Sequence, residues 1–256
     1  MKKIWITSLA HNENSVKNLM TALKPYHIPV DGGFWVDDLP KMAWTGIKDS
    51  LLDSEVGLWV IIANKDSWEN KSILKGVSAL ASMLRARRKT ALPILILGDG
   101  FELLADTLPT PLVQAKLLSM SAPTLGVKVL ALLNSPFSYA VNEYYLDFHP
   151  LNELGLWVEL SPSLSWSGMI LGVDSGEINF QAVGLRGTLP EKSVLEYPQQ
   201  GLEIALADKK FTAWGVQNHI NHENSYFARL TELPEQILFT PYTQDDETEA
   251  YIIRFC

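Results

Sequence analysis

Polar side chains that could contact a ligand follow two short apolar runs near the start of the sequence. Ser8 and His11 come after the run 4–7, and the pair Asp37 and Asp38 comes after the next such run. Asp38 could accept hydrogen bonds from the hydroxyls of a ribose. Each position also has a structural interpretation, because a serine and a histidine fit a loop that leads into a helix and acids at strand ends cap turns.

Three further side chains could act on a planar or charged group. Trp44 and Trp68 could stack on an aromatic ring, and Glu69 adds a carboxylate directly beside the second tryptophan. The alternatives are that each tryptophan is the apolar residue of an amphipathic helix and that Glu69 favours a helix start by its charge.

Other candidates are less specific. His219 and His222 have a spacing that binds metals on helices, but on a strand these side chains would point to opposite faces, and the asparagines around them favour a loop. We therefore predict no metal site. The basic cluster Arg85–Lys89 could bind phosphate or could end a helix in solvent. The sequence has no phosphate-binding or dinucleotide-binding glycine motif and no metalloprotease motif.

The first half of the chain alternates between strand patterns and helix patterns. Alternation of this kind predicts a parallel sheet with helices on both faces, and five strands fit a flavodoxin-like order. In such a sheet, ligands bind at the carboxyl ends of the strands, where Ser8, His11 and Asp38 are expected. The expected strands are 4–7, 34–36, 57–63, 93–97 and 116–120, and the helices follow positions 14, 44, 66 and 125.

The second half contains only short strand patterns separated by turn signals, which predicts an all-β sandwich or barrel. We expect a domain at 1–135, a linker at 136–149 and a β-rich domain at 150–256. The expected strands of the second domain are 156–160, 169–173, 178–183, 202–206, 211–216, 226–230, 237–240 and 251–255.

The charge is divided between the halves. Residues 1–140 hold 15 Lys and Arg against 12 Asp and Glu, a net charge of +3, whereas residues 141–256 hold 6 against 17, a net charge of −11. An acidic chain is a poor general binder of nucleic acid, because phosphates need compensating cations. We therefore expect no nucleic-acid partner.

The location is predicted from the cysteine content and from the absence of long apolar runs. Cys256 is the only cysteine, so no disulfide forms within the chain. No apolar run approaches the roughly 20 residues of a membrane span. The chain is expected to be cytoplasmic and to have no membrane partner.

Several segments of the first half occur in an order that is typical of one family. The opening strand leads through Ser8 into a polar loop, the second strand ends in an acid, and a third, apolar strand precedes a Ser-Trp pair at a helix start. The segments are Lys2–Ser8 with His11–Glu13, Phe34–Asp38, Trp44–Ile47, Gly57–Ala63 with Asp66–Trp68, and Pro93–Leu95.

In this order, the segments resemble TIR (Toll/interleukin-receptor) domains over roughly residues 1–135. The resemblance implies a flavodoxin-like fold and one of two activities. Some TIR domains assemble with other TIR domains in signalling, and others cleave NAD at the nicotinamide–ribose bond in bacterial defence or virulence. The cleaving group uses a glutamate four residues after the tryptophan, and that position is Ser72 here.

A carboxylate matters in that reaction because it stabilises the positive charge that develops on the ribose. Serine carries no such charge, and the nearest acid is Glu69. We therefore expect a TIR-like signalling or interaction protein that forms homo-oligomers or binds a TIR-like partner and needs no cofactor. The alternatives are an NAD glycohydrolase that uses Glu69, with NAD as its substrate, and a nucleotide-binding module that does no chemistry.

Overall fold

The computed structural model describes the whole chain except residues 1, 142, 152–153 and 244–248. The chain divides into two compact units, each described by itself. The α/β unit comprises Met1–Asp38 and Met42–Ala140, and the β unit comprises Leu39–Lys41 and Val141–Cys256. None of the described helices combines the length and the apolar character that crossing a membrane requires.

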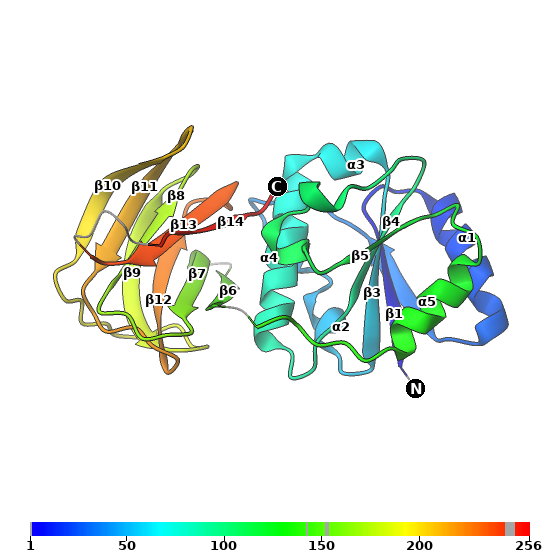
Figure 1. Cartoon of the computed structure of the whole chain (residues 1–256), viewed down its shortest axis with the longest axis horizontal. Helices are drawn as coiled ribbons and strands as arrows, with labels where there is room; N and C mark the ends of the chain where they lie inside the picture. Colours follow the sequence, from blue (N-terminus) through cyan, green and yellow to red (C-terminus); the bar gives the residue numbers. More distant parts are fainter. Residues whose placement is uncertain (1, 142, 152–153, 244–248) are drawn as a thin grey trace. The chain divides into compact units, whose positions relative to one another are not determined.

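The α/β unit contains a parallel five-stranded sheet with the strand order β2-β1-β3-β4-β5 (Figure 1). This confirms the predicted α/β architecture. The elements are β1 Lys3–Ser8, α1 Glu13–Leu23, η1 Lys24–Tyr26, β2 Val30–Phe34, η2 Ala43–Thr45, α2 Lys48–Leu52, β3 Val56–Ala63, α3 Lys65–Glu69, α4 Lys71–Arg87, β4 Ile94–Gly98, η3 Ala105–Thr107, η4 Thr110–Leu112, β5 Lys116–Ser119 and α5 Leu125–Asn134.

The central strands form because their residues are buried on both faces. β3 reads Val-Gly-Leu-Trp-Val-Ile-Ile-Ala, and all of its residues except Gly57 are buried. Leu58, Val60 and Ile62 pack with Leu19 of α1 and Val129 of α5 in one core. The alternate residues of β3 face the other side, where α2 contacts β3 and α4 packs against α2 (Figure 1), as a doubly covered parallel sheet requires.

Two predicted elements of this unit differ from the structure. The second strand is Val30–Phe34 rather than 34–36, because an edge strand whose middle residues are exposed has no apolar run to reveal it. The helix expected after Asp66 or Ser67 is two helices. Asn64 caps α3, and Asn70, in an extended conformation, ends α3 and caps α4.

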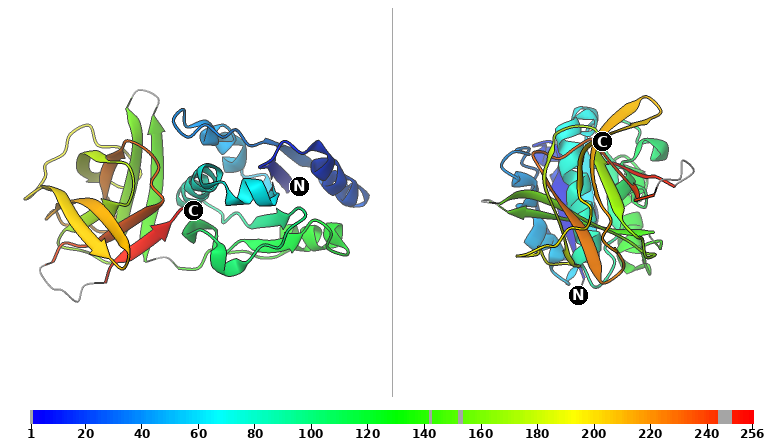
Figure 2. Two further views of the ribbon diagram at one scale, coloured as in Figure 1. Left: turned by 90° about the horizontal axis from the view of Figure 1, so that it is seen from above. Right: turned by 90° about the vertical axis from the view of Figure 1, so that its left-hand side faces the viewer.

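The β unit contains two antiparallel sheets that pack face to face (Figures 1 and 2). Their strand orders are β10-β11-β8-β13-β14 and β6-β7-β12-β9, and large side chains such as Phe148, Tyr226 and Phe239 are fully buried. The strands are β6 Tyr144–Leu151, β7 Gly155–Pro162, β8 Met169–Val173, β9 Ile178–Leu185, β10 Gln199–Leu206, β11 Lys209–Val216, β12 Asn224–Leu230, β13 Gln236–Pro241 and β14 Tyr251–Arg254.

The predicted linker 136–149 contains the start of a strand. β6 pairs with β7 in register from Tyr144 to Leu151, and its alternate residues Leu146 and Phe148 are buried. The sequence pattern does not predict this strand, because polar residues alternate with the apolar ones and Pro150 interrupts the run. The eight strands that the sequence predicts for this unit correspond to β7–β14 of the structure.

Candidate functional site

The parallel strands of the α/β unit end at one edge of the sheet, where the loops after β1, β2, β3 and β4 meet. Backbone hydrogen bonds join these loops: Leu9 N donates to Ile62 O at 2.9 Å, Trp35 N to Ser8 O at 2.9 Å and Asp99 N to Ala63 O at 2.8 Å. Because the strands are in register here, side chains from different loops come together.

The first polar cluster at this edge surrounds Asp99, which follows β4. Ser15 Oγ donates to Asp99 Oδ2 at 2.5 Å, and Asn12 Nδ2 lies 3.4 Å from the same oxygen. Asn12 Oδ1 also accepts hydrogen bonds from the backbone N–H groups of Asn14 and Ser15 and so caps α1. The carboxylate therefore lies at a helix N-terminus, where a negative charge is favoured.

The second polar cluster surrounds Asp37, which follows β2. Ser72 Oγ donates to Asp37 Oδ1 at 2.5 Å, and Asn70 Nδ2 lies 3.4 Å from Asp37 Oδ2. Asn70 Oδ1 caps α4 by accepting from the N–H groups of Ser72 and Ile73 at 2.9 and 3.4 Å. A carboxylate thus lies against Ser72, and it comes from another element of the fold.

Ser8 and His11 lie at the predicted edge, but in different surroundings. Ser8 is buried, and its hydroxyl donates to the carbonyl oxygen of Ala10. His11 is exposed, and its ring stacks on Phe34 with centroids 4.9 Å apart. Ser8 therefore shapes the loop, whereas His11 presents an imidazole to solvent.

The two tryptophans belong to the core of the α/β unit. Trp44 of η2 and Trp68 of α3 are 2% and 7% exposed. Asp38 is half-buried, and its carbonyl oxygen accepts the N–H of Ala43 at 3.0 Å, which shapes the start of η2. The burial of both tryptophans fits the interpretation that each is an apolar core residue of its helix.

Glu69 is a surface residue at the end of α3. Its side chain is 64% exposed, and Oε1 lies 3.8 Å from Nζ of Lys65, four residues earlier on the helix. The helix break at Asn70 places Glu69 and Ser72 on different helices. Counting four residues from Trp68 therefore crosses the break, which no pattern in the sequence revealed.

The Asp37 and Asp99 clusters could be anticipated only in part. Both aspartates are visible as strand-end acids, but their partners are asparagines and serines at helix starts, and no pattern in the sequence links these residues to the aspartates. The partners of Asp37 lie 33 and 35 positions from it along the chain, and the partners of Asp99 lie 84 and 87 positions from it. Only the sheet register brings them together.

Two hollows border this edge. An open pocket of about 810 Å³ lies at the ends of β4 and β5, lined by residues 99–103 and 117–121. A smaller groove of about 290 Å³ lies between α1 and β2, lined by residues that include Val16, Met20 and Phe34. The groove is mainly apolar, whereas the pocket presents Asp99 and Glu102.

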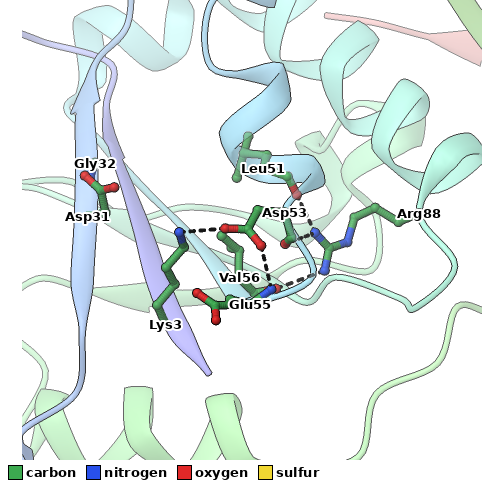
Figure 3. Close-up of polar contacts among 8 residues, drawn as sticks. All are labelled: Lys3, Asp31, Gly32, Leu51, Asp53, Glu55, Val56 and Arg88. Carbon is green, nitrogen blue, oxygen red and sulfur yellow. Dashed lines mark hydrogen bonds and ion pairs between the residues drawn. The ribbon is translucent and has the colours of Figure 1, made fainter. Parts of the chain in front are cut away.

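The basic cluster at the end of α4 is occupied within the α/β unit. The Arg88 guanidinium donates to the carbonyl oxygens of Leu51, Asp53 and Val56, and Lys3 Nζ lies 2.8 Å from Asp53 Oδ2 (Figure 3). Burial lowers the pKa of Arg88. This arginine therefore holds the loop before β3 and does not support the phosphate interpretation.

Arg85 of the same cluster also has local partners. One of its guanidinium nitrogens donates to Ala140 O at 2.5 Å, and its central carbon lies 4.6 Å from the centroid of the Tyr139 ring. Burial raises the pKa of Tyr139. The side chain is thus engaged by the segment that ends the unit.

His219 and His222 lie in the loop before β12, as the surrounding asparagines predicted. Asn224 Oδ1 accepts the N–H of Asn221 at 2.8 Å, and Asn224 Nδ2 donates to His219 O at 3.1 Å. The loop is built on asparagine side chains.

Comparisons with known proteins do not place the chain in a family. No family model matches it, and no curated protein matches it. Eight chains of solved structures match. One is a two-domain esterase active on acetylated mannans, crystallised with mannopentaose; it is 9% identical, the alignment covers 99% of this chain and 89% of that chain, and the TM-score is 0.30. A similarity this low carries no argument about the activity of this chain.

Proposed function

We propose that the chain is a TIR-like interaction protein, in which the α/β unit associates with itself or with a TIR-like partner. The β unit would sense a ligand or a second partner, and the protein would act in the cytoplasm without a cofactor. The strand order β2-β1-β3-β4-β5 is the order of flavodoxin-like sheets and supports the resemblance on which the proposal rests.

The proposal is carried by what the structure shows at Ser72, where the resemblance implies a catalytic glutamate, and at Glu69, the nearest acid. Ser72 carries a hydroxyl that donates to Asp37, and Glu69 is exposed beside Lys65. The tryptophans that could stack on a substrate are buried. A binding role for this end of the sheet needs none of these groups to react.

The groove between α1 and β2 supports association. Met20 of α1, which lines the groove, is 48% exposed, and Val36, which follows β2 just beyond the groove, is 58% exposed. β2 is an edge strand, and Asp31 Oδ1 accepts the N–H of Gly32 at 2.8 Å, which masks one donor of the edge. Contact through the apolar side chains of the groove is therefore favoured over continuous strand pairing.

The test is the mass of the whole protein in solution as a function of concentration, measured by light scattering. We expect the mass to rise with concentration toward a dimer or a larger assembly. A mass that stays monomeric at every concentration, with no partner recovered in a pull-down, would contradict the proposal.

A second candidate function is hydrolysis of NAD, and one observation favours it in a revised form. Asp37 places a carboxylate 2.5 Å from the hydroxyl of Ser72, the position at which the family glutamate is expected. In this version, Asp37 rather than Glu69 would stabilise positive charge on the ribose.

Nicotinamide release from NAD separates these candidates. The interaction proposal expects no release by the wild type, whether dilute or assembled. Release that is lost in Asp37→Asn and kept in Glu69→Gln would establish the second candidate, and the reverse pattern would restore Glu69. Both variants exchange a carboxylate for an amide of the same shape, so each is the control for the other.

Binding of a nucleotide without chemistry is the third candidate. The pocket beside Asp99 lies at the carboxyl end of the sheet, where such ligands bind, but its charged lining residues are Asp99 and Glu102, which do not favour a phosphate. Thermal stabilisation by nucleotides without turnover is the expected result. Equal melting temperatures with and without nucleotide would count against it.

A further inference from the structure

The outer face of the four-stranded sheet in the β unit carries three metal-ligand side chains on two neighbouring strands. Asp147 of β6 lies directly opposite Glu159 of β7, and His149 follows Asp147 by two residues. Side chains two residues apart on a strand point to the same face, and cross-strand partners share that face. Leu146 and Phe148, the neighbours of Asp147 on the strand, are buried and point into the core.

Both carboxylates are buried. Asp147 is 1% exposed and Glu159 is 0% exposed, whereas the side chain of His149 is 12% exposed. A buried carboxylate needs a cation or several hydrogen-bond donors to offset its lost hydration. His149 gives the group a small opening to solvent.

Each carboxylate has one oxygen held by a backbone N–H group. Asp147 Oδ1 accepts from Phe148 N at 2.7 Å. Glu159 Oε1 accepts from Gly187 N at 2.7 Å and from Ser225 Oγ at 2.7 Å. Hydrogen bonds of this kind orient the carboxylates of metal sites from outside the ligand shell.

The other oxygen of each carboxylate is turned toward His149. His149 Nε2 lies 2.7 Å from Glu159 Oε2 and 3.8 Å from Asp147 Oδ2. One ligand atom from each of the three residues lies within 4.8 Å of the other two. First-row cations bind such atoms at about 2.0–2.2 Å, so ligands around one ion lie about 3–4 Å apart. The distance from His149 to Asp147 matches this spacing, whereas the 2.7 Å hydrogen bond between His149 and Glu159 must open when an ion enters.

We propose that Asp147, His149 and Glu159 bind one divalent first-row transition cation, with Zn²⁺ as the representative ion. One imidazole nitrogen with two carboxylate oxygens suits such a cation better than Mg²⁺ or Ca²⁺, which prefer oxygen ligands alone. The ion joins β6 to β7 on the outer face of the sheet. This site departs from the prediction that the chain has no metal site and does not depend on the function of the α/β unit.

Arg186 lies on the same face and defines the limit of the site. Its guanidinium donates to Ser161 Oγ and stacks over Tyr145, with the central carbon 4.9 Å from the ring centroid. Tyr145 and Ser161 form the next cross-strand pair after Asp147 and Glu159. The arginine is therefore anchored in the row next to Asp147 and Glu159, two rows from His149, and its charge acts on Glu159 from that side.

The test is titration of the whole, chelator-treated protein with Zn²⁺ by calorimetry, with Mn²⁺, Mg²⁺ and Ca²⁺ in parallel. We expect one Zn²⁺ per chain and a rise in melting temperature with Zn²⁺. Absence of Zn²⁺ binding, or tighter binding of Mg²⁺ or Ca²⁺ than of Zn²⁺, would overturn the proposal.

Two variants separate a metal site from a purely hydrogen-bonded cluster. His149→Gln keeps a donor for Glu159 but removes the imidazole ligand, and we expect Zn²⁺ affinity at least about 100-fold lower. Ser225→Ala removes only the hydroxyl that orients Glu159, and we expect affinity about 10-fold lower or more. Circular dichroism checks folding, and Ser225→Ala decides the question if His149→Gln does not fold.

The matched control is the exposed histidine pair of the same unit. His219→Gln with His222→Gln removes two surface imidazoles, and Zn²⁺ affinity should stay at the wild-type value. Loss of binding in this double variant, or unchanged binding in both site variants, would show that Zn²⁺ binds elsewhere and would overturn the assignment.

Discussion

At the scale of single residues, the two edges of the parallel sheet are held by different chemistry. At the carboxyl edge, Asp37 and Asp99 accept hydrogen bonds from serines that begin helices. At the opposite edge, Arg88 collects three carbonyl oxygens and Lys3 pairs with Asp53 (Figure 3). The first edge carries carboxylates bound by helix-start serines, and the second edge ties the loop before β3 to α4 and β1.

Arg88→Ala should destabilise the α/β unit. The variant leaves three carbonyl oxygens in the loop before β3 without their donor, and the expected loss is about 1–3 kcal/mol. Urea denaturation measures it. Lys89→Ala is the control, because this exposed neighbour should change stability by no more than about 0.5 kcal/mol. Equal effects of the two variants would contradict the role assigned to Arg88.

Asp53 should make stability depend on pH in the acid range. Its hydrogen bonds from Lys3 and from the N–H of Glu55 hold its pKa below the usual 3.8. Folding therefore gains from the ionised form, so the stabilisation is complete above pH 3.8 and is lost as the pH falls through the lower, folded pKa.

Asp53→Asn tests this by denaturation at a series of pH values. The variant should be less stable than the wild type at neutral pH, and the difference should shrink as the pH falls below 3.8. Asp49→Asn, whose side chain is 89% exposed, should show no such trend. A difference between wild type and Asp53→Asn that is constant with pH would contradict the assignment.

At the scale of elements, β2 depends on one glycine. A Cβ at Gly32 would lie 2.2 Å from the carbonyl oxygen of Ile6 on β1, whereas a Cβ at Gly33 would meet nothing within 4 Å. A larger residue at position 32 would push β2 away from β1, so the glycine at this position allows the edge strand to pair with β1.

Gly32→Ala and Gly33→Ala form a matched pair. The first should cost about 1–3 kcal/mol because backbone must shift, and the second should be neutral or stabilise by up to about 1 kcal/mol. Thermal denaturation compares them. Equal stabilities would contradict the close approach of β2 to β1.

The elements also show how far the sequence could predict the structure. Apolar runs such as Gly57–Ala63 identified the buried strands, because burial on both faces leaves a continuous pattern. The edge strand β2 and the strand β6 lack such a run and were misplaced or treated as a linker. The Asp147–His149–Glu159 group was therefore missed, although an Asp-x-His pair with a glutamate ten residues later is a readable pattern once β6 is assigned.

The candidate site was predicted less well than the fold. The sequence placed Ser8, His11 and Asp38 near the correct edge of the sheet, since this follows from strand direction alone. It did not show that Trp44 and Trp68 are buried or that Asn70 breaks the helix after Trp68. Burial and helix phase depend on tertiary packing, which a single sequence does not reveal.

At the scale of the whole molecule, the chain forms two compact units. The net charge is +3 for residues 1–140 and −11 for residues 141–256, and these stretches correspond to the two units except for Leu39–Lys41. We propose that association uses the groove of the first unit and that the outer sheet face of the second unit binds a cation. These assignments are independent, so each can fail without the other.

The most direct test of the central claim is sedimentation of the wild type beside Met20→Glu and Val113→Glu. Met20 lines the groove, and Val113, which is 58% exposed after η4, is the matched control for adding a charge. We predict that the wild type and Val113→Glu associate alike and that Met20→Glu, which must bury a carboxylate at the contact, associates at least about tenfold more weakly. Equal association of all three proteins, or a wild type that sediments as a monomer at every concentration, would contradict self-association through this groove.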